Sequence, residues 1–464
     1  MLLALSQIAT ILGADLRGEG GLVPTSVSLD SRSVEQGACF VALRSTRDGH
    51  EFAAAAVEAG ASCLLVDHAV NVEAPQLVVP DTLLALQTWG QARLNACRPP
   101  AVFGVTGSVG KTSTKELLAG AVSGWKTPGN RNNTLGLPAA LATLPDGLGA
   151  AVLEMGMSTK GEIARLTEIA PPDFGVITNV GIAHLENFSG QQGIAEAKGE
   201  LVAGLVAGGA WVYPKDDPWC QWISQQAWAS KARSVAVGQG EPFSVVAAES
   251  LGPRGNRFSL GSPTGALDIE IKLTGGHQIQ NAALAASIAL IAGFDGSSVV
   301  RGLAAVEPEE GRGRLSPLVG GGWLLDESYN ASPDSVISCA KALLSLDGGE
   351  PLCVLGCIRE LGPDSASIHA ATGRALRGVG VSRVWAYGDF AADLCGGFGN
   401  GAFAYPDYET MEPSLAGLPQ GARILVKGSR HWKSERAVAS LLMLFGVRTG
   451  GPGAKGGASD TVDS

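Results

Sequence analysis

The chain has 464 residues, of which 45% are hydrophobic and 17% are charged, and it includes 64 glycines. This composition is typical of a globular α/β protein with many tight loops, and the length predicts about three domains. The formal net charge of −10 excludes general attraction to nucleic acid or to anionic membranes. We therefore expect no nucleic-acid partner, and an anionic ligand must be met by local basic residues.

The cysteine pattern and the first residues predict a cellular compartment. The eight cysteines are scattered without zinc-ligand spacing, which predicts that most are buried reduced thiols. The segment 1–16 has no basic stretch, and Leu5, Ile8 and Leu12 have helical spacing, which is unlike a signal peptide. No apolar run is long enough to span a membrane. We expect a cytoplasmic enzyme without membrane insertion.

The first segment, residues 1–98, alternates short strands and helices. A strand is predicted over 39–43, a helix over 52–60 and another strand over 63–66. Two consecutive prolines at 99–100 mark a break before the next segment. The pattern predicts a small N-terminal α/β domain that ends at residue 98.

The two following segments, 99–311 and 312–447, repeat strand-then-helix units. In the central segment, apolar runs predict strands over 101–105, 150–153, 175–178 and 210–213. In the C-terminal segment, strands are predicted over 323–326, 352–355, 383–387 and 424–426. We expect a mostly parallel central sheet and a second doubly wound α/β domain. The remaining residues, 448–464, are rich in Gly, Ser and Asp and are predicted to form a disordered tail.

A glycine loop follows the first central strand and precedes a helix predicted over 115–122. It reads Gly107-Ser108-Val109-Gly110-Lys111-Thr112-Ser113. In such a loop, backbone N–H groups converge on phosphate oxygens, the lysine reaches the terminal phosphates and the Thr112 hydroxyl can hold Mg²⁺. The loop departs from the common G-x-x-x-x-G-K-[ST] pattern, because Val105 stands where the first glycine is expected. It predicts ATP or GTP binding, and the alternative is a strand-to-helix turn that binds nothing.

Three further polar residues follow the predicted strands or lie on a helix. Glu154 ends a strand at the same sheet edge as the loop, where it could hold Mg²⁺, and capping a helix that begins near Ser158 is an equal alternative. His184 also follows a strand, and by itself it suggests a structural histidine. Lys198 alone would be interpreted as a solvated helix lysine.

A set of ordered strings resembles the Mur ligase family. The strings are Asp30-Ser31-Arg32, the loop at 106–112, Gly129-Asn130-Arg131-Asn132-Asn133, Glu154-Met155-Gly156, the string at 179–184, Ala197-Lys198-Gly199-Glu200 and the string from Asp326 to Pro333. The likeness extends from about residue 26 to Arg436, which is nearly the whole predicted folded chain. Within the family, the chain looks like the branch that adds D-alanyl-D-alanine.

The resemblance implies three α/β domains: a central parallel-sheet phosphate-loop domain for ATP, a small N-terminal domain for the UDP-sugar and a C-terminal Rossmann-like domain. Lys111 and the loop amides would hold the ATP phosphates. Thr112 and Glu154 would hold one Mg²⁺. His184 and Lys198 would hold a second Mg²⁺, with Lys198 carbamylated by CO₂, because an ammonium cannot ligate a cation whereas a carbamate can.

The resemblance also implies residues for the nucleotide and for the other substrates. Those expected at the nucleotide are Asn281, Arg312, Asp326, Tyr329 and Asn330, although Asn281 alone would be interpreted as an ordinary helix cap. Those expected at the substrates are Asp30, Ser31, Arg32, Asn132, Asn133, Lys427 and Arg430. The chain departs from the family pattern at Ser45, at Cys357-Ile358-Arg359 and at Glu327, and none of these is a proposed metal ligand.

The implied activity is ATP-dependent joining of D-Ala-D-Ala to UDP-MurNAc-tripeptide through an acyl phosphate, carried out by a monomer. Another amide ligase of the family remains an alternative, either the enzyme that adds the third stem residue or a folylpolyglutamate-type synthetase. A nucleotide-switched binding protein is the alternative from a different class. Whether the third residue of the tripeptide is meso-diaminopimelate or lysine stays open at this point.

Overall fold

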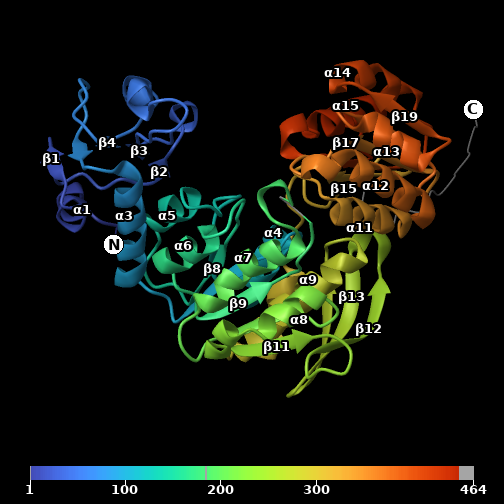
Figure 1. Cartoon of the computed structure of the whole chain (residues 1–464), viewed down its shortest axis with the longest axis horizontal. Helices are drawn as coiled ribbons and strands as arrows, with labels where there is room; N and C mark the ends of the chain where they lie inside the picture. Colours follow the sequence, from blue (N-terminus) through green and yellow to red (C-terminus); the bar gives the residue numbers. More distant parts are fainter. Residues whose placement is uncertain (1, 183–184, 449–464) are drawn as a thin grey trace, which may run out of the picture. The chain divides into compact units, whose positions relative to one another are not determined.

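The computed structural model describes residues 2–182 and 185–448, and its elements are labelled along the chain in Figure 1. The chain forms two compact units. One comprises Met1–Ala247, Ser259–Ile269 and Gln280–Val306, and the other comprises Ala248–Phe258, Glu270–Ile279 and Glu307–Ser464. The predicted tail, apart from residue 448, lies outside the described residues, as does His184.

The N-terminal part of the first unit is a five-stranded sheet with the order β1-β5-β4-β3-β2. Only β1 and β5 are antiparallel. Its strands are β1 Asp15–Arg17, β2 Val27–Ser28, β3 Cys39–Val41, β4 Cys63–Val66 and β5 Gln76–Val78, and its helices are α1 Leu5–Leu12, α2 Ala53–Glu58 and α3 Thr82–Ala96. The predicted strands over 39–43 and 63–66 and the helix over 52–60 are confirmed with slightly shorter bounds for the first strand and the helix.

Helix α3 packs closely against α5, Gly136–Leu141, in the central part of the same unit. A side chain at Gly90 would place its Cβ 2.6 Å from the carbonyl oxygen of Pro138, so the two helices can approach this closely only through a glycine. The buried Arg93 donates from Nε to the carbonyl oxygen of Leu144 at 2.8 Å. These contacts join the N-terminal and central sheets into one unit.

The central sheet has the order β11-β10-β9-β6-β8-β7, and all its neighbouring strands are parallel, as predicted. The strands are β6 Ala101–Thr106, β7 Trp125–Lys126, β8 Ala150–Glu154, β9 Phe174–Ile177, β10 Ala210–Pro214 and β11 Arg233–Val237. Strand β6 is buried along its whole length and lies between β8 and β9. Strands that come later in the chain lie on both sides of β6. Ligands of open parallel sheets bind at the carboxyl end of a strand at which the strand order reverses in this way.

The helices of the central region are α4 Lys111–Val122, α6 Glu162–Ile169, α7 Gln191–Ala203, α8 Pro218–Ser224, α9 Gly276–Ile291 and α10 Gly296–Ala304. Helix α4 begins at Lys111, so the predicted start at residue 115 is wrong. The glycine loop leads directly into the helix, with Gly110 as its N-cap.

A small sheet has the order β12-β13-β14, with β12 Ser244–Ser250, β13 Asn256–Ser262 and β14 Gly265–Ile271.

The second unit contains a six-stranded sheet with the order β15-β16-β20-β17-β18-β19, parallel except where β15 meets β16. The strands are β15 Arg314–Pro317, β16 Trp323–Glu327, β17 Pro351–Gly356, β18 Arg383–Tyr387, β19 Ala402–Tyr405 and β20 Arg423–Lys427. The helices are α11 Pro333–Leu344, α12 Ser365–Val379, α13 Ala391–Phe398, α14 Tyr408–Met411 and α15 Glu435–Phe445. All four strands predicted for this segment are confirmed.

Alternate residues of β17 belong to different hydrophobic clusters, one on each face of this sheet. Leu352 and Val354 pack in one cluster, and Cys353 and Leu355 pack in the other. The strand is therefore buried on both faces, which explains its continuous apolar sequence.

The eight cysteines of the chain are free thiols, and six of them are buried. Among the described helices, none combines the length and apolar character needed to cross a membrane.

Candidate functional site

The glycine loop is compact because its two internal glycines face neighbouring elements closely. Gly107 has φ +152°, and a Cβ there would lie 1.8 Å from Thr178 Oγ1 at the end of β9. Gly110 has φ +84°, and its Cβ would lie 2.7 Å from Asn281 Oδ1. Both positions therefore require glycine. Asn281 lies inside α9, so it is not the helix cap that the residue alone suggested.

The backbone of the loop is held by a residue after β9. Asn179 Oδ1 accepts from the Ser108 N–H at 3.1 Å and from the Val109 N–H at 3.0 Å. These two N–H groups are therefore occupied within the protein. No side chain caps the start of α4, where Thr112 is buried and Ser113 is half-buried. The N–H groups of that first turn, with the partial positive charge of the helix end, are the donors suited to a phosphate.

The Lys111 ammonium lies over the loop from which the lysine projects. Its Nζ donates to the carbonyl oxygens of Gly107 at 2.7 Å and of Ser108 at 3.3 Å. The loop therefore encloses a cation next to the uncapped helix start. A phosphate bound at that helix start would meet both a positive charge and backbone donors.

The Glu154 carboxylate is buried at the end of β8 and binds the hydroxyl of the loop. Its Oε2 accepts from Thr112 Oγ1 at 2.8 Å, and its Oε1 accepts from Asn132 Nδ2 at 2.8 Å. The alternative that Glu154 caps a helix near Ser158 is wrong, because α6 begins at Glu162 after the N-cap Gly161. The 2.8 Å between Thr112 Oγ1 and Glu154 Oε2 is close to the ~3 Å between adjacent ligands of an octahedral Mg²⁺. These hard oxygens fit that ion.

Lys198 is a buried residue of α7, with 3% of its surface exposed, so the interpretation as a solvated lysine is wrong. Burial lowers the pKa of its ammonium well below the usual value, and repulsion from Lys111 lowers it further. Among the described residues, no hydrogen bond or ion pair reaches Lys198. The structure therefore favours the neutral amine at this position.

The two residues after Lys198 fix the position of α7. A Cβ on Gly199 would lie 2.2 Å from the Trp228 ring, so only glycine allows this contact. Glu200 accepts from the Gly161 N–H at 2.7 Å and from the Ala164 N–H at 3.0 Å, at the start of α6. The Lys-Gly-Glu string thus combines one buried amine with two residues that hold its helix.

The two adjacent asparagines before α5, Asn132 and Asn133, make different hydrogen bonds. Asn132 is the amide donor to Glu154 Oε1. Asn133 Oδ1 instead accepts from the Leu135 N–H at 3.2 Å and from the Gly136 N–H at 2.7 Å, which caps the start of α5. Asn132 therefore lies in the candidate site, and Asn133 caps α5 while its predicted substrate contact stays a prediction.

In the second unit, two arginines lie over one aromatic ring. The Arg312 guanidinium carbon lies 3.8 Å from the centroid of the Tyr329 ring, and that of Arg430 lies 5.5 Å from it. Asn330, the next residue, is exposed. Asp326 accepts from the Gly311 N–H at 3.0 Å, so it also fixes the loop that leads to Arg312.

A buried ion pair joins the ends of the neighbouring strands β16 and β20. Lys427 Nζ, at the end of β20, lies 3.2 Å from Glu327 Oε2, at the end of β16. The Lys427 side chain is 4% exposed. The ion pair therefore occupies the carboxyl edge of this parallel sheet, where Lys427 was predicted to contact substrate.

In the N-terminal sheet, polar residues follow three adjacent strands. After β2, the Arg32 guanidinium pairs with Asp30 at 2.6 Å and lowers the pKa of that carboxyl to about 2. Ser31 lies between them in a turn. After β3 and β4, Arg44 Nε pairs with Asp67 Oδ2 at 2.6 Å and lowers the pKa of Asp67 to about 2. The three strand ends share one edge, which is where parallel sheets bind ligands.

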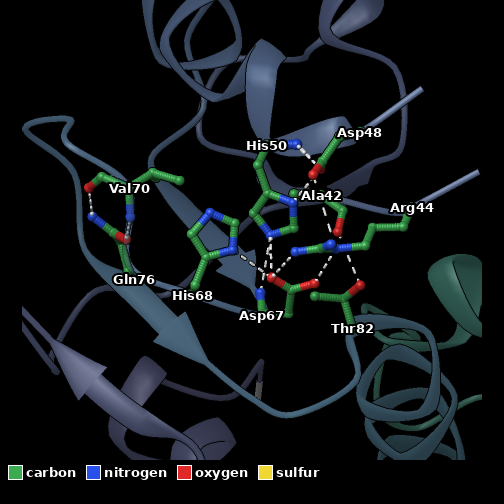
Figure 2. Close-up of polar contacts among 9 residues, drawn as sticks. All are labelled: Ala42, Arg44, Asp48, His50, Asp67, His68, Val70, Gln76 and Thr82. Carbon is green, nitrogen blue, oxygen red and sulfur yellow. Dashed lines mark hydrogen bonds and ion pairs between the residues drawn. The ribbon is translucent and has the colours of Figure 1, made fainter.

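Figure 2 shows the network around Asp67, which the sequence analysis missed. Asp67 Oδ1 lies 2.5 Å from His68 Nδ1 and 3.3 Å from His50 Nε2. His50 Nδ1 lies 2.6 Å from Asp48, and its Nε2 accepts from the Asp67 N–H at 3.0 Å, so both nitrogens of this ring have partners. The cluster is therefore a hydrogen-bonded network rather than a set of open metal ligands. Its signal in the sequence was the position of Asp67 directly after a predicted strand.

Together, the fold and the site define an α/β protein with a phosphate loop and a buried carboxylate beside it. Three Mur ligase models match the chain: "Mur ligase family, catalytic domain" over residues 24–103, "Mur ligase middle domain" over 105–289 and "Mur ligase, glutamate ligase domain" over 313–430. The chain belongs to the Mur ligase family, as the resemblance indicated.

Curated relatives match nearly the whole chain. The UDP-N-acetylmuramoyl-tripeptide--D-alanyl-D-alanine ligase of Escherichia coli is 34% identical over 94% of this chain and 98% of its own length. The enzyme of the same name from Bacillus subtilis is 33% identical over 90% of this chain and 93% of its own.

Solved structures extend the likeness to the fold. MurF from Acinetobacter baumannii has a TM-score of 0.84 at 30% identity and covers 96% of this chain and 99% of its own. MurF ligase from Thermotoga maritima in complex with ADP has a TM-score of 0.77 at 27% identity, covering 90% and 97%. The predicted α/β fold of the family is thereby confirmed.

Proposed function

We propose that this chain is the ATP-dependent ligase of peptidoglycan precursor synthesis that joins D-Ala-D-Ala to UDP-MurNAc-tripeptide. The relatives of that name from Escherichia coli and Bacillus subtilis match it over nine-tenths or more of its length. The observation that carries the proposal is the buried contact of Glu154 with Thr112 directly after the phosphate loop. Both substrates are small molecules, and the enzyme acts as a cytoplasmic monomer.

The reaction proceeds in two steps and needs no side-chain nucleophile. The C-terminal carboxylate of the tripeptide attacks the γ-phosphorus of ATP, ADP leaves, and an acyl phosphate forms. The amine of D-Ala-D-Ala then attacks the acyl carbon, and inorganic phosphate leaves as the amide forms. Two anions meet in the first step, so the site must neutralise charge and align the groups.

Residues of the first unit supply the phosphate and metal contacts. The start of α4 and Lys111 bind the phosphates, and Thr112 and Glu154 hold one Mg²⁺. When bound, Mg²⁺ neutralises charge on the phosphates. Asn132, which orients Glu154, also faces the substrate.

Lys198 serves a second Mg²⁺ site as a carbamate, together with His184, which lies outside the described residues. Carbamylation joins the amine nitrogen to the carbon of CO₂ and releases a proton. Only the neutral amine reacts, and burial lowers the pKa of Lys198, which favours that form. The product is an anionic oxygen ligand suited to a hard cation.

The remaining predicted residues divide between the other ligands. Asn281 and Tyr329 contact the adenosine with Asp326 and Asn330, and Arg312 contacts the phosphates. Asp30, Ser31 and Arg32 contact the UDP-sugar, and Lys427 and Arg430 contact the peptide end. Asn133, whose Oδ1 caps α5, contacts the substrate through its amide. The domain limits stay those predicted, at residues 98, 311 and 447.

The test follows phosphate release and the ligated product together. The enzyme is supplied with ATP, Mg²⁺ and each UDP-tripeptide, containing meso-diaminopimelate or lysine, with and without D-Ala-D-Ala. We expect release to require the tripeptide and to rise further with the dipeptide, and mass spectrometry to show the corresponding pentapeptide. Strong ATP turnover without either substrate, or slow turnover that the dipeptide does not change, would contradict the ligase.

A further inference from the structure

Lys115 is a fully buried lysine of α4, one turn after the phosphate-loop lysine, and its side chain is 0% exposed. Its Nζ donates to the carbonyl oxygens of Gly129 at 2.9 Å and of Thr127 at 3.1 Å. It also lies 3.2 Å from Glu116 Oε1 and 3.6 Å from Glu154 Oε2. A buried ammonium is stable only with such oxygens around it, so the pocket is built for a positive charge.

The oxygens around Lys115 belong to elements that meet at the candidate metal carboxylate. Thr127 Oγ1 accepts from the Glu154 N–H at 3.1 Å, which binds the segment after β7 to the end of β8. That segment continues to Asn132, whose amide donates to the other oxygen of Glu154. One ammonium thus connects α4, Glu154 and the segment that carries Asn132.

We propose that Lys115 is a built-in counter-ion for Glu154 and acts as a positioning residue. The ammonium holds the carboxylate against the Thr127–Gly129 segment before a divalent cation binds. Mg²⁺ and Lys115 then share the Glu154 carboxylate, so the position of Asn132 is coupled to occupancy of the metal site. This role rests on the proposed function, in which Glu154 holds Mg²⁺.

The charge of Lys115 has a measurable consequence for metal binding. Two cations that share one carboxylate repel each other, so the ammonium weakens Mg²⁺ binding while it fixes the geometry. Replacing the lysine with an uncharged side chain of similar length removes that repulsion. The metal then becomes the main counter-ion of Glu154.

The first experiment titrates Mg²⁺ into ligand-free protein and measures the thermal midpoint, with chelator as the zero point. For Lys115→Met, we expect the midpoint to rise at an Mg²⁺ concentration about tenfold lower than for the unmodified chain. Lys126→Met is the matched control, because the half-exposed Lys126 pairs with Glu116 but has no contact with Glu154. The control should keep the unmodified Mg²⁺ response.

The second experiment is a double-mutant cycle with Lys115→Met and Glu154→Gln, measured as denaturant midpoints in chelator. The double variant should lose less stability than the sum of the two single losses, because each single change removes a charge partner of the other residue. In Glu154→Gln, Lys115 keeps its second carboxylate partner, Glu116. Lys115→Gln replaces Lys115→Met if the latter does not fold. An unchanged Mg²⁺ response together with additive losses would overturn the proposal.

These readouts separate the positioning role from the proposed function, because neither requires substrate. A coupled cycle and a shifted Mg²⁺ response support the counter-ion even where the ligation assay fails, and then only the assigned reaction is wrong. Conversely, if the unmodified enzyme ligates normally and the two stability losses in the double-mutant cycle are additive, the positioning role of Lys115 is wrong and the proposed ligase function stands. A kcat decrease for Lys115→Met at saturating Mg²⁺, with little change in the KM for ATP, is the accompanying kinetic expectation.

Discussion

Two buried lysines of the first unit contrast in what surrounds their ammonium groups. Lys115 on α4 has two carbonyl oxygens and two carboxylates within 3.6 Å. Lys198 on α7 has no such partner among the described residues, and burial lowers its pKa well below the usual value. Both lysines are buried, but their surroundings favour opposite protonation states. The pocket of Lys115 stabilises the charged ammonium, and the pocket of Lys198 favours a neutral amine that can be modified.

The largest effect that we expect from this contrast is on ligation activity. Lys198→Ala should reduce ligation by about 10³-fold or more, because it removes a metal ligand rather than a charge partner. Short-chain carboxylates should restore part of the activity by placing oxygens in the vacated space. Steady-state ligation in buffers with and without carboxylate and CO₂ measures this.

The matched control for this rescue is the other lysine. Lys115→Ala should not be rescued by carboxylates, since its pocket is already lined with carbonyl and carboxylate oxygens. Depletion of CO₂ should depress the unmodified enzyme. Full activity of Lys198→Ala would end the second-metal assignment and the role of His184 with it.

A second prediction compares the stability of the same two sites. Lys115→Met should lower the free energy of unfolding by about 3–5 kcal/mol, because the buried Glu154 carboxylate and two carbonyl oxygens lose their cation, whereas Glu116 keeps Lys126. Lys198→Met should leave stability unchanged or raise it by about 1 kcal/mol, since it removes a buried amine with no ion-pair partner among the described residues. Denaturant unfolding in CO₂-depleted, chelated buffer measures both. Equal losses would show that the two environments do not differ as the contacts suggest.

The sequence predicted one of these lysines and missed the other for a physical reason. The parallel strands, the phosphate loop and the edge position of Glu154 follow from apolar runs and glycine spacing, which are local patterns. Burial of Lys198 and Lys115 depends on elements distant in the chain. Only family resemblance drew attention to Lys198. Lys115, in the polar run at the start of α4, carries no local sign that its ammonium meets Thr127 and Gly129.

The same limit applies to the N-terminal network. The sequence predicted Asp30 and Arg32 but not Arg44, His50, Asp67 and His68, which converge from separate strand ends. The resemblance also predicted a substrate contact for Asn133, which stays a prediction; the structure adds that its Oδ1 caps α5, a role the sequence did not indicate. Convergence across strands requires the register of the sheet, which a single sequence does not supply.

A third prediction tests how α7 presents Lys198. Gly199→Ala would place a Cβ 2.2 Å from the Trp228 ring, so the helix or the indole must move. We expect a loss of about 1–3 kcal/mol in unfolding free energy and a fall in ligation larger than the stability loss explains. Gly378→Ala is the control, since Gly378 also lies inside a helix, α12, and its Cβ would have no neighbour within 4 Å. If both variants behave alike, the indole contact does not position Lys198.

The smallest prediction concerns pH and follows from the lowered pKa of Lys198. Between that lowered value and the ordinary value of 10.5, the unfolded chain binds a proton at Lys198 and the folded chain does not. Stability from this group therefore rises with pH across the window, by at most about 1.4 kcal/mol per pH unit, and is lost as the pH falls. Lys198→Met lacks this group, so its stability relative to the unmodified chain should decline as the pH rises through the window below 10.5. Unfolding of both proteins across that range, in CO₂-depleted buffer, measures the difference, because every other titrating group cancels between them. A constant difference would mean that Lys198 keeps its proton when folded. The Lys198 pocket would then favour the ammonium, as the pocket of Lys115 does.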